Sequence, residues 1–182
     1  MAWQLDGRHR QTRSSASLGL HNYFKISGMG NNKQLVVRFV EELWNQRKLE
    51  IAEDIFDIDC HTFQLQSGVP ATSSPRGPEI IKNHIVEWLS GFPDLKFNIE
   101  QMIAEGDRVS TLLVMDGTHT GQWLGIPPTG KRINIRMMTI HRIRSGKIIE
   151  DWVIVESLGF FQQLGILSPT SVLLNEFLPK KK

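Results

Sequence analysis

The side chains best placed for chemistry are a histidine and a glutamate on two adjacent predicted strands. Residues 139–165, TIHRIRSGKIIEDWVIVESLGFFQQLG, are typical of a strand, a tight turn, a second strand and a short helix. Ser145-Gly146 fits the turn, because glycine accepts the positive φ angle that a two-residue hairpin loop requires. Alternation along the strands places His141 and Glu156 on faces that are otherwise largely apolar. We therefore expect both to face one cavity, where a carboxylate and an imidazole can transfer protons.

Other side chains are candidates to bind a ligand in the same cavity. Met137 and Thr139 follow the same alternation as His141. Aromatic rings suit a planar ligand, and a further histidine lies in the glycine-rich segment GTHTG. The candidate substrate-binding residues are His119, Trp123, Trp152, Met137 and Thr139.

Each candidate also has a purely structural interpretation. Glu156 could begin the final helix, where a carboxylate interacts favourably with the N-terminal helix dipole. His141 could be a core histidine whose hydrogen bonds are satisfied, and His119 could stabilise its loop by a hydrogen bond. Trp152 could simply pack in the core. Two further tryptophans, on helical apolar stripes, are expected in the core: Trp44 and Trp88.

The composition is ordinary for a soluble globular protein and argues against several classes of function. Of the 182 residues, 40% are hydrophobic and 22% charged, with a formal net charge of +2, which does not favour nucleic acid or an anionic membrane. No apolar run approaches the ~20 residues of a membrane span. Cys60 is the only cysteine, so no intrachain disulfide can form, and a cytoplasmic location fits best. The histidines show no metal-ligand spacing, so we expect no metal site.

The order of the predicted elements, helices first and long strands after, indicates an α+β fold. An apolar stripe predicts a helix over residues 33–46, and a second short helix follows at 49–55. Pro78 suits the first turn of a third helix, which ends at Gly91. Two hairpins supply four long strands. We expect three segments: a poorly ordered extension over 1–30, one domain over 31–168, and a tail over 169–182.

Three long stretches of the chain resemble the SnoaL-like polyketide cyclases, a family within the nuclear-transport-factor-two-like (NTF2-like) superfamily. They are FPDLKFNIEQMIAEGDRV at 92–109, GTHTGQWLGIPPTGKRI at 117–133, and the stretch at 139–165 that ends in LGFFQQLG. The resemblance covers residues 33–167 and implies a cone-shaped barrel. In such a barrel a strongly curved mixed or antiparallel sheet has the N-terminal helices over its open side. The resemblance also implies a deep pocket, no metal or bound cofactor, and intramolecular aldol ring closure (ester cyclase activity) in characterised members.

The resemblance further suggests roles for individual residues. The family's acid/base is an aspartate just before the LGxxQQLG-like segment, and that position here is Glu156, which keeps the carboxylate and adds a methylene. A pocket histidine of the family falls near His141, and another polar pocket residue matches His61. We therefore expect Glu156 to be the general acid/base, His141 to orient it or share its proton, and His61 to donate a hydrogen bond.

Two classes of function fit these residues. One is a cyclase, isomerase or lyase that performs acid/base chemistry without a cofactor on a polyketide-like or other apolar carbonyl substrate. The other is a non-catalytic module of the same fold that binds a small ligand or dimerises. In either case we expect a small apolar or aromatic carbonyl ligand, and a homodimer or higher homo-oligomer, because apolar residues on the outer strand face need cover. The residues expected on that face are Leu112, Val114, Met138, Ile140, Val153 and Val155.

Overall fold

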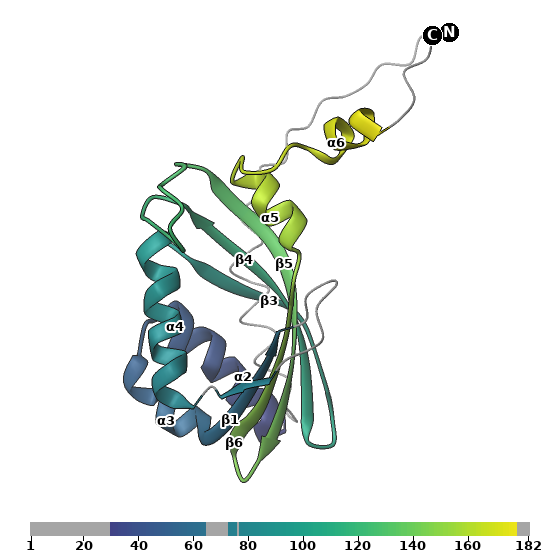
Figure 1. The fold of residues 1–182 in the computed structure, drawn as a ribbon. Helices are drawn as coiled ribbons and strands as arrows, with labels where there is room; N and C mark the ends of the chain where they lie inside the picture. The colour runs from purple at the N-terminus through teal and green to yellow at the C-terminus, as the bar shows by residue number, and fades with distance from the viewer. Residues whose placement is uncertain (1–29, 65–72, 76, 178–182) are drawn as a thin grey trace, which may run out of the picture.

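The fold is an open, mixed sheet of six strands with helices on one face (Figure 1). A computed structural model describes residues 30–64, 73–75 and 77–177. The strands lie in the order β2-β1-β6-β5-β4-β3. Strands β1 and β6 pair in parallel, and every other neighbouring pair is antiparallel. The strands are β1 (Phe56–Gln64), β2 (Ser73–Pro75), β3 (Lys96–Glu105), β4 (Arg108–Thr118), β5 (Arg132–Arg144) and β6 (Lys147–Val155).

The N-terminal helices and α4 lie on one side of this sheet (Figure 1). The first helix begins as a regular α-helix and continues as a wider π-helix, which together present one buried apolar stripe that includes Phe39 and Trp44. Pro78 is the first residue of α4, where its missing N–H costs no hydrogen bond. The helices are α2 (Asn31–Arg38), η1 (Phe39–Asn45), η2 (Leu49–Ile51), α3 (Ala52–Ile55), α4 (Pro78–Gly91), α5 (Ser157–Gln163) and α6 (Thr170–Phe177).

The α+β class and the position of the N-terminal helices over one face are confirmed. The cone-shaped barrel is not: the described strands form an open sheet, whose end strands β2 and β3 do not pair with each other. The extension expected over residues 1–30 falls almost entirely outside the described residues. The expected tail contains one helix, α6, which projects away from the sheet (Figure 1).

The end of α4 is held by the loop that follows β4. The backbone N–H groups of Thr120 and Gly121 both donate to the carbonyl oxygen of Gly91, each at 3.0 Å. A Cβ atom on Gly121 would lie 1.8 Å from the carbonyl oxygen of Ser90, so only glycine allows this close approach. The loop therefore fixes the position of α4, which carries part of the cavity wall described below.

The hairpin between β5 and β6 decides which side chains of β6 face the helices. Ser145 and Gly146 both have positive φ angles, 51° and 77°, as a two-residue hairpin turn requires. Arg142 pairs with Glu150 but its neighbour Ile143 pairs with Ile148, so Ile149 is an extra residue, a β-bulge. One extra residue reverses the alternation beyond it.

The predicted facing of β6 is therefore wrong beyond the bulge. Val153 and Val155 were expected on the outer face but line a cavity on the helix side, together with Asp151. The alternation then places Glu150, Trp152 and Ile154 on the opposite face, although Trp152 was expected inside. The bulge is the physical reason for each of these differences.

Candidate functional site

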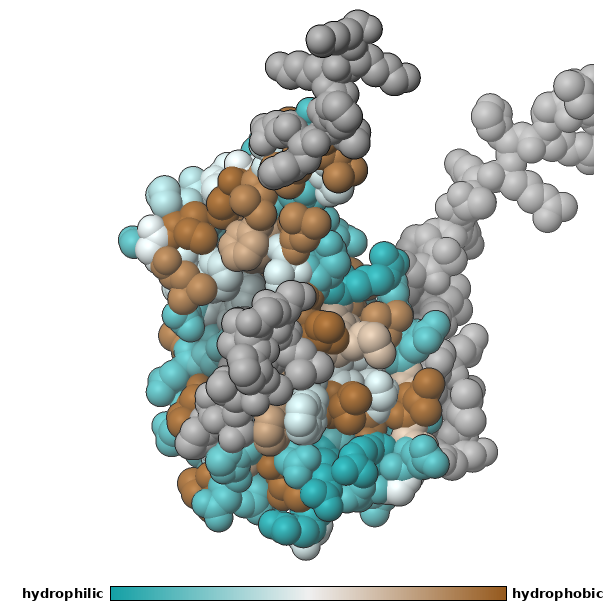
Figure 2. Space-filling model, turned by 45° about the vertical axis from the view of Figure 1, so that its right-hand side comes forward, coloured by the Kyte–Doolittle hydropathy of each residue, from teal (hydrophilic) through white to brown (hydrophobic). Residues whose placement is uncertain are grey.

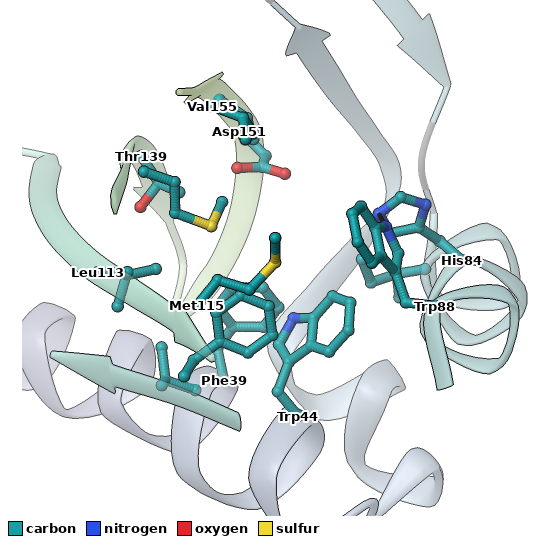
Figure 3. A pocket seen from close by; sticks show the side chains of 14 residues that line it. Phe39, Trp44, His84, Trp88, Leu113, Met115, Thr139, Asp151 and Val155 are labelled. Carbon is teal, nitrogen blue, oxygen red and sulfur yellow. Dashed lines mark hydrogen bonds between the residues drawn. The ribbon is translucent and has the colours of Figure 1, made fainter. Parts of the chain in front are cut away.

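A cavity of about 90 Å³ lies between the sheet and the helices η1 and α4 (Figure 3). Aromatic side chains make much of the helix wall, and the sheet wall includes two methionines and two polar residues. The volume holds several water molecules, since one needs at least about 10–15 Å³. It is small beside the roughly 300–1,000 Å³ of typical ligand pockets. The lining residues used below are Trp44, His84, Trp88, Met137, Thr139 and Asp151.

Asp151 is the buried carboxylate of this cavity. Its side chain is only 4% exposed, and it faces the cavity from β6 (Figure 3). Its Oδ2 accepts a hydrogen bond from the Thr62 hydroxyl at 3.4 Å, and its Oδ1 lies 3.3 Å from Nε2 of His141. Burying a carboxylate is costly unless polar groups surround it; here Thr62 donates a hydrogen bond to Oδ2, and the His141 ring lies close to Oδ1 without forming a hydrogen bond. The arrangement is thus a carboxylate–imidazole pair at the edge of an apolar cavity.

His141 lies on the predicted inner face of β5, but it is completely buried behind Asp151 and does not line the cavity, so the expectation that it faces the cavity is wrong. Its ring packs edge-on against Phe39, with centroids 5.3 Å apart. Nδ1 of His141 has no hydrogen-bond partner among the residues that the structure describes, and neither do the buried hydroxyls of Thr111 and Thr139. Of these three residues only Thr139 lines the cavity, and its hydroxyl gives that side of the cavity the capacity to bind water or a polar group of a ligand.

Met137 and Thr139 line the cavity on the expected face of β5, and their role in binding stays a prediction. Glu156 does not line it. Its side chain is exposed, and its Oε1 accepts a hydrogen bond from the backbone N–H of Gly159 at 2.8 Å. Glu156 is the N-cap of α5, so the expectation that it faces the cavity beside His141 is wrong.

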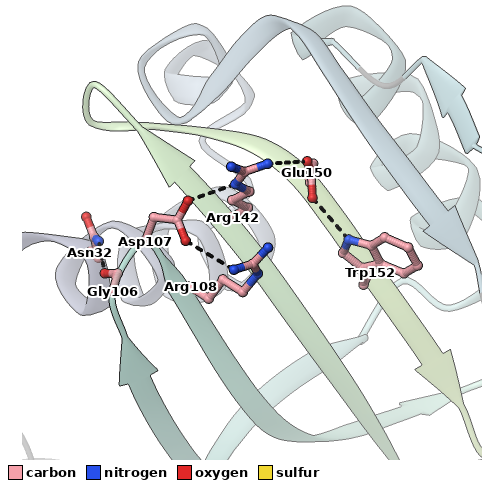
Figure 4. A network of polar contacts seen from close by, with 7 residues as sticks. All are labelled: Asn32, Gly106, Asp107, Arg108, Arg142, Glu150 and Trp152. Carbon is pink, nitrogen blue, oxygen red and sulfur yellow. Dashed lines mark hydrogen bonds and ion pairs between the residues drawn. The ribbon is translucent and has the colours of Figure 1, made fainter.

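His61 and Trp152 lie on the other face of the sheet. His61 pairs in register with Glu150, one residue before the inward pair of Thr62 and Asp151. Trp152 stacks on Phe63, with ring centroids 3.9 Å apart, and its Nε1–H donates to Glu150 at 3.3 Å (Figure 4). Neither side chain reaches the cavity, because the same alternation that turns Asp151 inward turns both outward.

His119 and Trp123 lie one layer behind the cavity wall. Nδ1 of His119 accepts from the backbone N–H of Thr129 at 3.3 Å, and its ring stacks on Phe92 at 4.8 Å, which favours the loop-stabilising interpretation. Trp123 is buried against Trp88, with centroids 4.6 Å apart. Their predicted contact with a ligand is therefore not direct in this structure.

Among the lining residues that sequence reasoning did not assign to the cavity are the titratable and indole side chains: Asp151, His84, Trp44 and Trp88. The two tryptophans were expected in the core. His84 lies three residues after Ile81 and four before Trp88, so helical spacing places it on the inner face of α4. The adjacent apolar residues Ile148 and Ile149 interrupt the alternation of β6 and are the available signal of the bulge that turns Asp151 inward.

In the described ranges, no three His, Cys, Asp or Glu side chains gather so that they could hold a metal ion. None of the described helices is long and apolar enough to span a membrane.

The sequence matches the family model described as SnoaL-like polyketide cyclase over residues 34–164. Two curated relatives are aklanonic acid methyl ester cyclases. DauD from Streptomyces sp. (strain C5) is 30% identical over 139 residues, covering 74% of this chain and 83% of DauD. DnrD from Streptomyces peucetius is 31% identical over 147 residues, covering 78% of this chain and 96% of DnrD.

Two solved structures share the fold. AclR from Streptomyces galilaeus matches with a TM-score of 0.67 and 26% identity, over 82% of this chain and 92% of AclR. IdmH from Streptomyces antibioticus matches with a TM-score of 0.63 and 26% identity, over 74% of this chain and 98% of IdmH. Both similarities extend over most of each chain, so the α+β arrangement described above is shared as a whole.

The burial of His119 predicts a pH-dependent stability. Burial lowers the pKa of His119 below its ordinary value of 6.5, because the charged imidazolium is poorly solvated there. Between the folded-state pKa and about pH 6.5 the unfolded chain binds a proton that the folded chain does not, so the free energy of unfolding falls as the pH falls below 6.5. We expect His119→Asn, whose amide can still accept from Thr129, to weaken this dependence.

The measurement is urea unfolding of both proteins at pH 7.5 and pH 5.5. Carboxylates contribute equally to both proteins, so the difference between them isolates His119. An identical loss of stability on acidification in wild type and variant would contradict the assignment.

Proposed function

The chain belongs to the SnoaL-like polyketide cyclase family, and from this premise we propose that it catalyses an aldol ring closure on a polyketide-like carbonyl substrate. The observation that carries the proposal is the position of Asp151, a buried carboxylate at an apolar cavity with an imidazole 3.3 Å away. Asp151 takes the role expected of Glu156, which caps a helix instead. His141 then positions the carboxylate of Asp151.

In the proposed reaction one proton moves from the substrate to Asp151 and later returns to the substrate. Asp151 removes a proton from a carbon next to a carbonyl group, and the electron pair of the C–H bond shifts onto the carbonyl oxygen to give an enolate. The enolate carbon attacks a second carbonyl carbon of the same molecule and closes the ring. The protonated Asp151 then returns its proton to the new alkoxide. No oxidant, reductant or co-reactant is consumed, so the chain's own side chains are sufficient for the chemistry.

The substrate class follows from the relatives. DauD and DnrD are cyclases of aklanonic acid methyl ester, and we infer that this chain also takes a planar ester or ketone of the polyketide type. The aromatic wall of Trp44 and Trp88 suits planar rings. A multi-ring molecule needs more than the present 90 Å³. We propose that Met115 and Met137 move to make room, because methionine side chains are flexible.

We propose that a second copy of the chain covers the outer face of the sheet, because apolar side chains are exposed there. Met138, Ile140 and Ile154 are 47%, 41% and 48% exposed, and hydrophobic side chains gather over this side of the molecule (Figure 2). Ion pairs such as Arg136–Glu100 and Arg142–Asp107 flank them (Figure 4 shows the second). Positive and negative side chains alternate on this face, so two copies related by a twofold axis can place opposite charges next to each other.

The central prediction compares two identical chemical changes. Asp151→Asn keeps the shape of the side chain and an acceptor for Thr62 but removes the base, so kcat on aklanonic acid methyl ester should fall about 10²-fold or more. Glu156→Gln makes the same carboxylate-to-amide change outside the cavity and should keep kcat within about threefold. Steady-state turnover of the three proteins is the measurement.

Circular dichroism and thermal unfolding control for loss of folding in either variant. A fall in kcat for Glu156→Gln with none for Asp151→Asn would contradict the proposal and return the acid/base role to Glu156. Wild-type protein that binds the ester without converting it would instead favour a ligand-binding module.

A further prediction concerns the oligomeric state. Light scattering at micromolar concentration should give about twice the monomer mass of 20.8 kDa for the wild type. Ile140→Glu places a charge in the centre of the apolar outer face and should give the monomer mass. Val86→Glu, at an exposed position of α4, is the matched control and should leave the mass unchanged. A wild-type mass of 20.8 kDa would refute the second copy.

A further inference from the structure

Thr62 is a buried residue whose hydroxyl contacts Asp151 from outside the cavity. It is only 4% exposed, and it is the register partner of Asp151 where β1 pairs with the parallel strand β6. Its hydroxyl donates a hydrogen bond to Oδ2 of Asp151 at 3.4 Å. Thr62 is not among the residues that line the cavity, whereas Asp151 is. A ligand in the cavity can therefore contact Asp151 while Thr62 stays behind it.

The local structure of β1 turns Thr62 inward. The register of β1 against β6 shifts between Phe56 and His61. From Cys60 onward the side chains alternate: Cys60 and Thr62 are buried, and His61 and Phe63 are not. A β-branched side chain in a strand has few rotamers, so the backbone of β1 restricts the position of the hydroxyl.

A hydrogen bond from a hydroxyl group changes both the charge and the geometry of a carboxyl group. It favours the ionised form, whereas apolar surroundings favour the neutral acid. It also restricts rotation about the bond between Cβ and Cγ, which is otherwise loosely restricted in aspartate. Only an ionised carboxylate can remove a proton from a substrate, so both effects bear on the proposed base.

We propose that Thr62 is a positioning residue, whose hydroxyl keeps the carboxylate of Asp151 ionised and oriented for proton removal. This inference rests on the proposed acid/base function of Asp151 and adds the group that prepares the base. Thr62 neither touches the substrate nor exchanges a proton with it. Its effect on the reaction passes through Asp151 alone, which distinguishes this role from simple packing in the core.

Other titratable side chains surround Asp151 and stay unchanged in the tests. Nε2 of His141 on β5 lies 3.3 Å from Oδ1 of Asp151. Cys60 lies two residues before Thr62 on the same face of β1, and His84 lines the cavity from α4. Because all of them are present in each variant, a comparison of changes at Thr62 isolates the effect of its hydroxyl.

The ionisation of Asp151 can be measured without any turnover. A pH titration by ¹³C NMR of carboxyl-labelled aspartate, with the Asp151 signal identified by its loss in Asp151→Asn, gives the midpoint. Thr62→Val keeps the shape of the side chain and removes the donor, so the midpoint should rise by about one pH unit. Thr62→Ser keeps the hydroxyl and should stay within about 0.3 unit of the wild type. An unchanged midpoint in Thr62→Val would overturn the proposal.

The pH profile of turnover tests whether this ionisation matters for the reaction. In Thr62→Val the acid limb of kcat/KM for aklanonic acid methyl ester should move to higher pH by the same amount. At the pH optimum kcat should fall about tenfold, with little change in KM because Thr62 does not line the cavity. Thr62→Ser should restore both. A wild-type profile in Thr62→Val would contradict the role of Thr62.

Thr111→Val is the matched control. It makes the same change at a buried threonine of β4, whose hydroxyl has no hydrogen-bond partner among the described residues and which does not line the cavity. Its kcat and pH profile should equal those of the wild type. The same displacement of the profile in Thr111→Val would show that loss of any buried hydroxyl is enough, and would overturn the proposal.

The two proposals fail in different ways. Full turnover in Asp151→Asn would refute the acid/base function itself. A loss of turnover in Asp151→Asn together with an unchanged midpoint in Thr62→Val would refute the role of Thr62 alone. In the Asp151→Asn background, Thr62→Val should cause no further fall in kcat, because residues that act through one another are not additive. A further fall there would show that Thr62 does not act through Asp151.

Discussion

One extra residue in β6 determines which face of that strand carries chemistry. With Ile149 bulged out of the ladder, Ile148 stays in the core and Asp151, Val153 and Val155 turn towards the helices. A strand of unbroken alternation would present Glu150 and Trp152 to the cavity instead. The bulge therefore replaces a glutamate, a tryptophan and an isoleucine by an aspartate and two valines in the cavity wall, and so changes the shape of the cavity.

The buried carboxylate depends on its neighbouring strands as much as on the bulge. Thr62 on the parallel strand β1 and His141 on β5 are the register partners of Asp151. These neighbours reduce the cost of burying a carboxyl group, because each oxygen of Asp151 has a polar side chain within 3.4 Å. The helix wall is fixed separately: the loop after β4 bonds to the end of α4, and Trp123 packs behind Trp88. Packing therefore fixes the strands and the helix that carry the two walls before any ligand enters.

The features that could be predicted from the sequence are those that periodicity and turn residues determine. The Ser145-Gly146 hairpin, the helix that begins at Pro78 and the inner face of β5 all follow from local rules. The direction in which Glu156 points does not follow from local rules. A single bulge reverses which side chains of β6 face the helices, and Glu156 accepts a hydrogen bond from the backbone of α5. The position of His84 in the cavity wall was not predicted. That position depends on contacts between residues far apart in the chain.

The central claim is that Asp151 removes a proton from a carbon next to a carbonyl, and isotope exchange measures that step alone. The protein is incubated in D₂O with a planar aromatic ketone, 1-tetralone, and deuterium at the carbon beside the carbonyl is followed by mass spectrometry. The wild type should incorporate deuterium faster than buffer, and Asp151→Asn should incorporate it at the buffer rate. Equal incorporation by the two proteins, whether fast or at the buffer rate, would contradict the account.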